Sequence, residues 1–269
     1  ATRVPLDSDM WWHLRAGEVS WLRKVPLITD QFTSTRAGER WINLFWLSQV
    51  ILYLIYQLGV YRGLSLIVAV LAAVSMGFVY LQMDGSPIQR AFMVVFGVPV
   101  AATVWAPRPQ MISLVSFAGL SYLLYLYKWR GKNLLWMCPL LFMLWSNFHG
   151  GYALGLILMG VYVVGGIIDS ILDRPKEMTL TGKGIAEVLM WLSISALVVV
   201  INPNGFSMWA IPFKTIGIRI LQESILEWKS PDFHDIYQQP FIWLLLTTLG
   251  AAGISRRRLD GTDLVGVVL

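Results

Sequence analysis

Long apolar stretches without any charged side chain alternate along the chain with short polar stretches that carry all of the charge. An α-helix needs about 20 predominantly apolar residues to cross a hydrocarbon layer about 30 Å thick. The uncharged stretches are of about this length or longer, and they cover 41–61, 63–83, 91–107, 109–127, 133–168, 188–213 and 236–255. The pattern therefore predicts an all-α fold, namely a polytopic transmembrane helical bundle with interfacial juxtamembrane helices.

Seven transmembrane helices are predicted from these stretches, at about 63–83, 89–107, 109–128, 133–147, 150–168, 185–202 and 240–255. The segment 133–147 is short and contains Pro139, so a re-entrant half-helix is the alternative there. We keep it as a span, because a half-helix would reverse the topology of all later segments and would place Arg256–Arg258 outside. The stretch 41–61 is either an eighth span or an interfacial helix, and its Trp and Tyr side chains suit the headgroup region.

The basic residues distinguish between these two topologies. If 41–61 lies in the interface, the short loops on one side contain ten basic residues, and those on the other contain only Arg108. Because Lys and Arg in short loops resist translocation, we expect the Asp7 loop outside and Arg256–Arg258 in the cytoplasm, in a plasma or inner membrane. The predicted segments are an external loop with juxtamembrane helices (1–62), transmembrane helices (63–202), an external loop with an amphipathic helix (203–239), and a transmembrane helix with a cytoplasmic basic loop (240–269).

The composition supports this interpretation. Only 14% of the residues are charged, against about 25% in soluble domains, and 56% are hydrophobic, which excludes soluble enzyme folds. The net charge of +5 comes from clusters beside the apolar stretches, so no nucleic-acid partner is expected. The single Cys138 excludes an intrachain disulfide. The apolar run that opens at 264–269 indicates a segment of a longer membrane protein.

Two aspartates, Asp7 and Asp9, precede a segment that contains Trp11 and Trp12. One of them is expected to cap a helix that runs to about Leu22, because a carboxylate at this position accepts the first unpaired amide protons. At the external surface the pair could also hold a divalent cation through its oxygens, or one member could take a proton as general base. The sequence therefore suggests Asp7 and Asp9 as catalytic residues and a divalent cation as a candidate cofactor.

The order of these features resembles the GT-C superfamily of polytopic membrane glycosyltransferases, which use polyprenyl-phosphate-linked sugars. The likeness consists of an acidic pair at the start of a juxtamembrane helix, a glycine at the end of that helix (Gly17), and a second interfacial helix that ends at Gly59 and Arg62. Three motifs are also similar to those of a bacterial group of uncharacterised membrane proteins: Asp7–Leu14, Trp145–Gly151 and Glu227–His234.

The resemblance implies that Asp7 or Asp9 is the catalytic acidic residue. The two aspartates are separated by Ser8, whereas the superfamily commonly has two adjacent acidic residues. This difference leaves open which aspartate acts and whether a metal takes part.

Further polar residues share the predicted external face with the acidic pair. Arg108 and Gln110 stand where a span begins. Arg108 is either a snorkelling anchor or a guanidinium fork for the phosphate of the donor. Asn147 and His149 interrupt an apolar run, where polar groups need hydrogen-bond partners. We predict that both, with His13, contact substrate, and a tight turn between spans is the alternative for Asn147 and His149.

The predicted external loop 203–239 has an amphipathic pattern over 213–228, and Glu227, Asp232 and His234 lie in its last part. Carboxylate and imidazole groups at this spacing could bind a metal, although a solvated loop has the same composition. The resemblance implies a lid that closes over the active site.

The leading hypothesis is a glycosyltransferase-like membrane protein that transfers a sugar from a polyprenyl-phosphate donor at the external face. Membrane lipids and this donor are the expected partners. One rival is a non-catalytic subunit that contacts other membrane subunits through small-residue helix surfaces. The other is a transporter of a small solute, with Arg108 and His149 along its path.

Overall fold

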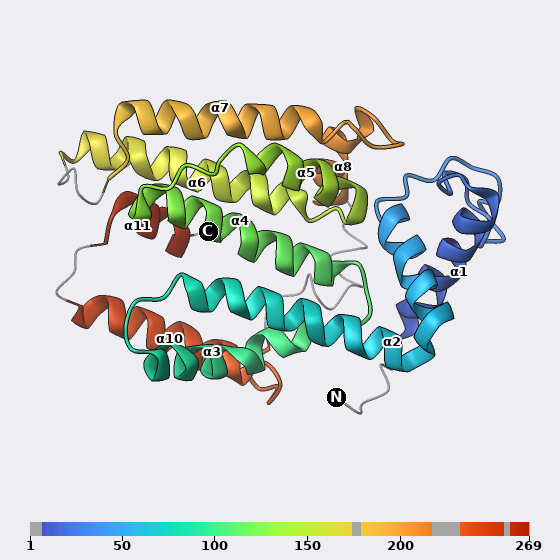
Figure 1. The fold of residues 1–269 in the computed structure, drawn as a ribbon, viewed down its shortest axis with the longest axis horizontal. Helices are drawn as coiled ribbons and strands as arrows, with labels where there is room; N and C mark the ends of the chain where they lie inside the picture. The colour runs from blue at the N-terminus through green and yellow to red at the C-terminus, as the bar shows by residue number, and fades with distance from the viewer. Residues whose placement is uncertain (1–6, 174–178, 217–231, 256–258, 269) are drawn as a thin grey trace.

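The computed structural model describes residues 7–173, 179–216, 232–255 and 259–268. Over these ranges the chain is helical, and the only β-type pairing is an isolated antiparallel bridge between Thr29 and Arg40. Most helices lie along the long axis of the molecule, whereas α1 (Ser8–Arg23) is at one end with the first part of α2 (Figure 1). The prediction of an all-α fold is therefore confirmed for the described residues.

Four helices in the described ranges are long and apolar enough to cross a membrane. They are α2 (Trp46–Leu81), α3 (Pro87–Ala101) continued by the 3-10 turn η1 (Ala102–Val104), α4 (Gln110–Arg130) and α6 (Tyr152–Ile171). The other three predicted spans correspond to shorter helices, α5 (Met137–Phe148), α7 (Gly182–Val198) and α10 (Gln239–Ile254). At 1.5 Å per residue, α5 is only about 18 Å long. The helix is thus shorter than the predicted span over 133–147, and the crossing of the membrane by this segment stays a prediction.

Helix α2 changes direction at Val60, whose backbone is not helical (φ 47°, ψ −137°). Its first part packs against α1, and its second part runs alongside α4 in the bundle (Figure 1). Positive φ is uncommon for a β-branched residue, so Val60 marks a true break between two helices. The break lies between Gly59 and Arg62, where the sequence predicts the interfacial helix to end.

The segment that contains α5 crosses from one end of the bundle to the other despite its short helix. Before α5, Asn133 Nδ2 donates to Glu187 Oε1 at 2.5 Å, and the hydroxyl of Tyr127, near the end of α4, donates to the same carboxylate at 2.8 Å. After α5, Nδ1 of His149 lies 2.6 Å from Oγ of Ser113, near the start of α4. The chain therefore alternates between the two ends through this region, as the sequence predicts.

A short helix, α11 (Gly261–Val268), packs against α6. The two backbones touch, because a Cβ on Gly261 would lie 2.2 Å from the oxygen of Gly165. Beside this contact Lys128 Nζ is 2.9 Å from Asp260 Oδ2, with the two side chains only 1% and 2% exposed. Lys128 is one of the ten basic residues that the sequence assigns to the short loops, and the structure corrects this: Lys128 lies in the last turn of α4 and is half of a buried ion pair.

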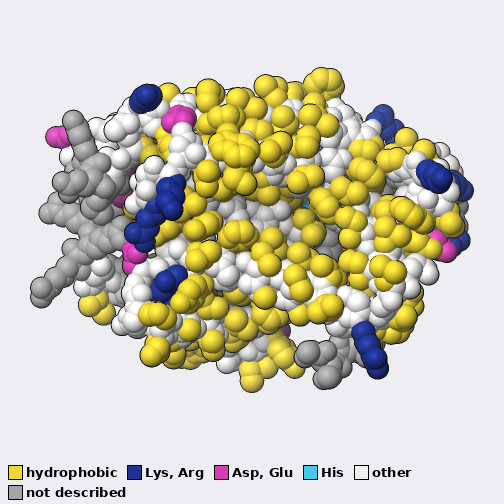
Figure 2. Space-filling view, in the orientation of Figure 1, with side chains coloured by type: hydrophobic (Ala, Val, Ile, Leu, Met, Phe, Trp, Pro, Cys, Tyr) yellow, Lys and Arg dark blue, Asp and Glu magenta, His cyan; other side chains and the backbone are white. Residues whose placement is uncertain are grey.

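The two ends and the middle of the molecule differ in chemistry. In Figure 2 hydrophobic side chains cover the middle, and the Lys and Arg side chains lie toward the two ends. Helices α3 and α10 pack against each other and bury no residue of their own, and they expose large side chains such as Phe92 and Trp243. A broad apolar belt of this kind is what a membrane-spanning protein presents to lipid.

Candidate functional site

The first component of the site is the start of α1. Asp7 is the N-cap of the helix, and its Oδ1 accepts a hydrogen bond of 2.9 Å from the backbone N–H of Asp9. Asp9 lies in the first helical turn, where a carboxylate is stabilised by the positive end of the helix dipole. The helix ends at Arg23, beyond the predicted end at about Leu22. The two aspartates therefore have different roles in the local structure.

The second component is Arg108, which follows η1 and precedes α4. Its Nε lies 3.4 Å from Asp7 Oδ2, and its Nη2 forms an ion pair with Asp9 Oδ2. When the amide of Gln110 is oriented to suit its neighbours, its Oε1 accepts from Nη1 and Nε of Arg108 at 3.1 and 3.2 Å. The side chains of Asp7 and Arg108 are 17% and 21% exposed, whereas that of Asp9 is 42% exposed. Asp9 is thus the aspartate that an external molecule reaches more easily.

Two histidines, the buried His13 and the partly buried His149, form the third component. His13 lies one turn after Asp9 on α1, and its Nδ1 is 3.3 Å from Nε2 of Gln49 on α2. His149 follows α5, and its Nδ1 is 2.6 Å from Oγ of Ser113 and 2.9 Å from the backbone nitrogen of Gly151. The ring of Phe45 is between 5 and 6 Å from both imidazoles, at 5.3 Å from His13 and 5.4 Å from His149.

Burial and a nearby positive charge keep both histidines neutral. Burial, then the charge of Arg108, then His149 lower the pKa of His13 from 6.5 to about 3. Burial, then the charge of Arg108, lower the pKa of His149 from 6.5 to about 4. Asp7, Asp9, Arg108, His13 and His149 therefore belong to one cluster of interacting groups, assembled from α1, the start of α4 and the segment after α5.

Two polar residues of the site region hold the helices together. The side chain of Asn147 accepts from Trp46 Nε1 at 2.9 Å and donates to the backbone oxygens of Met143 and Ile201 at 2.8 and 2.7 Å. All of its amide hydrogens are thus used within the protein. Asn202 donates to the backbone oxygen of Ser146 at 2.8 Å. The contacts give Asn147 a structural role, and its predicted contact with substrate stays a prediction.

Three polar residues that the sequence analysis did not single out support this cluster. Asn43 and Gln49 are joined by a hydrogen bond of 2.7 Å and lead to His13. Ser113 accepts from Trp145 Nε1 at 2.7 Å and contacts His149. The signal that could have found the first two is their position as amides in the otherwise apolar stretch 41–61.

The predicted lid and metal residues are described only in part. Glu227 and most of the predicted amphipathic helix over 213–228 fall outside the described residues, and α8 (Ser207–Ile216) contains only the first few residues of that helix. Asp232 accepts from the backbone nitrogen of His234 at 3.0 Å, on a side chain that is 67% exposed. Within the described residues no group of three or more His, Cys, Asp and Glu side chains could hold a metal ion.

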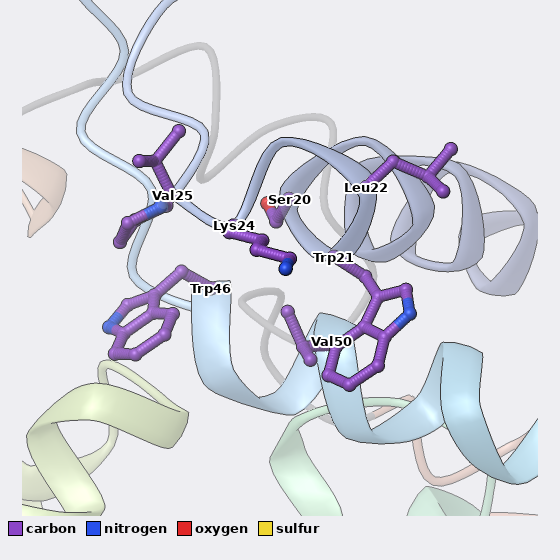
Figure 3. Close-up of a pocket in the computed structure, with 8 residues that line it drawn as sticks. Ser20, Trp21, Leu22, Lys24, Val25, Trp46 and Val50 are labelled. Atoms are coloured by element: carbon purple, nitrogen blue, oxygen red, sulfur yellow. The ribbon is translucent and has the colours of Figure 1, made fainter.

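A cavity of about 480 Å³ lies between the C-terminal end of α1 and the start of α2 (Figure 3). Its lining is mostly apolar and includes Trp21, Trp46 and Val50, while Lys24 brings an ammonium group toward it. Lys24 ends α1 in the left-handed conformation, at φ 57°. Because Trp46 also donates to Asn147, the cavity adjoins the network that holds the site together.

Gly17 has a different place from the predicted one. It lies inside α1 and not at its end, and a Cβ on it would lie 2.0 Å from the backbone oxygen of Gln49. The absence of a side chain thus allows α1 to approach α2 at the turn that carries Gln49.

Comparison with known proteins adds no relative: no family model, no curated protein and no solved structure matches this chain.

Proposed function

We propose that the chain is a polytopic membrane glycosyltransferase-like protein that transfers a sugar from a polyprenyl-phosphate donor. The observation that carries the proposal is the contact of Arg108 with Asp7 and Asp9, because it joins a phosphate-binding group to a candidate base at one end of an apolar bundle. The fold supports the membrane location through four helices of sufficient length and an apolar belt between the charged ends. A lipid-linked donor is confined to the bilayer, so its sugar and phosphate are presented at this depth.

The sidedness of the proposal follows from the distribution of basic residues. The starts of α3 and α7 and the end of α4 lie at the end of the bundle opposite α1 (Figure 1), and Arg90, Lys132 and Lys183 lie in or next to these segments. Because basic residues in short loops stay in the cytoplasm, the end with Asp9 and Arg108 faces outward in a plasma or inner membrane. The part of α2 before Val60 then rests with α1 at the outer surface.

The geometry separates the roles of the two aspartates. Asp7 caps α1 and anchors Arg108, and the more exposed Asp9 is the base. The acceptor oxygen forms a bond to the anomeric carbon of the sugar while its proton passes to Asp9. The bond from that carbon to the phosphate oxygen breaks, and the electron pair leaves with the polyprenyl phosphate. The guanidinium of Arg108 stabilises the charge that develops on this leaving group.

A divalent cation does not fit the acidic pair as it is arranged. The guanidinium of Arg108 contacts both carboxylates, so a cation would have to displace a permanently charged group from between them. Oxygen-rich sites for Mg²⁺ or Ca²⁺ need several such ligands at short distance, whereas each carboxylate here already has a cationic partner. The proposed reaction therefore uses no step through a metal.

Sugar transfer by the full chain in proteoliposomes tests the proposal. The assay supplies a panel of undecaprenyl-phosphate sugars with membrane-extracted acceptors and measures the release of undecaprenyl phosphate by mass spectrometry. Because a general base contributes roughly 10²- to 10⁴-fold, we expect Asp9→Asn to lower the rate of release at least about 100-fold. Asp84→Asn is the matched control, because Asp84 is an exposed, ion-paired aspartate on a different loop.

Equal rates for Asp9→Asn and the wild-type protein would refute the catalytic role of Asp9. A wild-type protein that releases no undecaprenyl phosphate but copurifies in fixed stoichiometry with other membrane proteins would replace the enzyme by the subunit alternative. Passage of a small solute through proteoliposomes, lost on changing Arg108, would favour transport.

A further inference from the structure

The protonation pattern of His13 and His149 can be deduced from their hydrogen-bond partners. A neutral imidazole carries its proton on one nitrogen and accepts through the other, and the partner of one nitrogen decides which is which. Backbone N–H groups only donate, so a chain of hydrogen bonds that begins at a backbone N–H has a fixed direction. Both histidines are attached to such chains.

For His13 the chain begins at Phe45. Its backbone N–H donates to Oδ1 of Asn43 at 3.1 Å, which leaves Nδ2 of Asn43 to donate to Oε1 of Gln49 at 2.7 Å. The amide of Gln49 must then present Nε2 to His13, at 3.3 Å from Nδ1. Since Gln49 donates, Nδ1 of His13 accepts, and the proton of the ring is on Nε2. Asn43, Gln49 and His13 are at most 3% exposed, so the direction of this chain of hydrogen bonds is set within the protein.

For His149 the chain is shorter. The backbone N–H of Gly151 donates to Nδ1 at 2.9 Å. Trp145 Nε1 donates to Oγ of Ser113 at 2.7 Å, and this Oγ lies 2.6 Å from the same Nδ1. Because Nδ1 accepts from Gly151, the hydroxyl of Ser113 must be the donor in this contact. Nδ1 of His149 therefore also accepts, and its proton is on Nε2.

The two Nε2–H groups are the unused donors of the site. Among the described residues no hydrogen bond involves Nε2 of His13 or His149, and neither atom is among the buried polar atoms that lack a partner. Neither Nε2 is therefore fully enclosed by the protein. The low pKa of each ring keeps it neutral at pH 7, so each contributes a hydrogen bond without a charge.

We infer that Gln49 and Ser113 are positioning residues that fix His13 and His149 as Nε2–H donors, which bind phosphate oxygens beside Arg108. The ligand part of this inference rests on the proposed function, whereas the tautomers follow from the hydrogen bonds alone. Neither histidine is then a base in the reaction, because the lone pair of each Nδ1 is already occupied. The proton of the acceptor goes to Asp9, and the histidines hold the leaving phosphate.

Nitrogen NMR of the full chain in nanodiscs, labelled with ¹⁵N in histidine, tests the tautomers. The chain has only three histidines, and His234 is fully exposed and serves as an internal reference. We expect His13 and His149 to show a protonated Nε2 and an unprotonated Nδ1 from about pH 7 to about pH 5. A protonated Nδ1 on either buried histidine in the wild-type protein would overturn the inference.

Exchange of Gln49 for glutamate changes the direction of the last hydrogen bond in the series that leads from Phe45 to His13. In Gln49→Glu the carboxylate cannot donate, so we expect the proton of His13 to move to Nδ1 while His149 keeps its pattern. Sugar transfer should fall about 100-fold, the typical effect of losing one donor at a developing oxyanion. Gln82→Glu is the matched control, because Gln82 is a partly buried, hydrogen-bonded glutamine of α2 at the other end of the bundle. An unchanged His13 in Gln49→Glu would contradict the role of Gln49.

Farnesyl phosphate and inorganic phosphate then test the ligand. We expect farnesyl phosphate to shift both Nε2 signals and to leave His234 unchanged, and a shift with inorganic phosphate would show that the phosphate alone is recognised. No shift with either would overturn the assignment of phosphate. If the tautomers and phosphate shifts are as expected but no sugar is transferred, the proposed function fails and the assignment of the histidines as donors remains.

Discussion

The buried ion pair between Lys128 and Asp260 provides a test of the fold that does not depend on function. Lys128 is in the last turn of α4, and Asp260 precedes α11, so the pair fastens α11 to the bundle. Lys128 Nζ also donates to Oγ1 of Thr262 at 2.6 Å. Replacement of Lys128 by methionine shortens the side chain by one atom and removes its charge.

The size of the effect follows from the burial of the pair. Both side chains are at most 2% exposed and 2.9 Å apart, so Lys128→Met leaves the carboxylate of Asp260 without its cation in a place that water does not reach. Removing one partner of a buried ion pair costs about 3–5 kcal/mol, whereas replacing both partners is often nearly neutral. At about 2–4 °C per kcal/mol, Lys128→Met should lower the unfolding temperature by roughly 10 °C.

A double variant separates the charge from the packing. Asp260 also caps α11, since its Oδ1 accepts from the backbone nitrogen of Asp263 at 2.9 Å. Asparagine caps helices as well as aspartate does, so Asp260→Asn keeps the cap and removes the charge. We therefore expect Lys128→Met combined with Asp260→Asn to be more stable than Lys128→Met alone, by at least about 2 kcal/mol.

Thermal unfolding in detergent, followed by tryptophan fluorescence, measures these differences. The control is Arg36→Met, which breaks an ion pair whose side chains are 72% and 54% exposed and should change stability by less than about 1 kcal/mol. If Lys128→Met is no less stable than Arg36→Met, the charges of the Lys128–Asp260 pair are solvated, and the docking of α11 onto α6 is wrong.

Three further predictions concern the site region. Asp7→Ala should destabilise the protein by about 1 kcal/mol more than Asp7→Asn, because asparagine retains the N-cap, and thermal unfolding compares the two. Gly17→Leu should cost at least about 2 kcal/mol, because a side chain there would meet the α2 backbone at 2.0 Å, whereas Gly97→Ala, with no atom within 4 Å of the added carbon, should cost nothing. The lowered pKa of His149 means that the unfolded chain binds a proton more readily, so stability present above about pH 6.5 should be lost as the pH falls toward the folded pKa of about 4. From pH 7 to about pH 5 His149 accounts for about 1–2 kcal/mol of the loss, and His13, whose pKa is lowered to about 3, adds a similar amount. The loss should therefore be smaller in His149→Gln but unchanged in His234→Gln.

The arrangement of helices could be predicted from the sequence because its cause is simple. Charged residues are excluded from apolar surroundings, so the uncharged stretches mark most helices of the bundle. Asp7 was predictable as a cap because capping depends on a few neighbouring residues. The shared location of Asp9 and Arg108, far apart in the chain, could be predicted because the alternation of spans returns both segments to the same end.

The supporting network of the histidines could not be predicted in the same way. Asn43, Gln49 and Ser113 are single polar residues in apolar stretches, and many such residues in helices bond only to their own backbone. Ser75, for example, donates to the backbone oxygen of Ala72 within α2. Which polar residues meet across helices depends on the rotation of each helix about its axis, and the hydropathy pattern of a helix that is apolar all round contains little information about that rotation.

Lys128 shows that counting Lys and Arg in short loops can include a residue whose charge is neutralised within the protein. A lysine at the end of a span is normally solvated and counts toward the positive side, and sequence alone treats Lys128, Arg130 and Lys132 alike. Lys128 differs because α11 returns to the bundle and brings Asp260 against it in a buried place, whereas the ion pair of Arg130 with Asp84 is exposed. The charge of Lys128 is thereby neutralised within the protein, so the positive bias of this end rests on the remaining basic residues. Nine of the ten basic loop residues still favour the same end, and the proposed outward position of Asp9 and Arg108 is therefore unaffected.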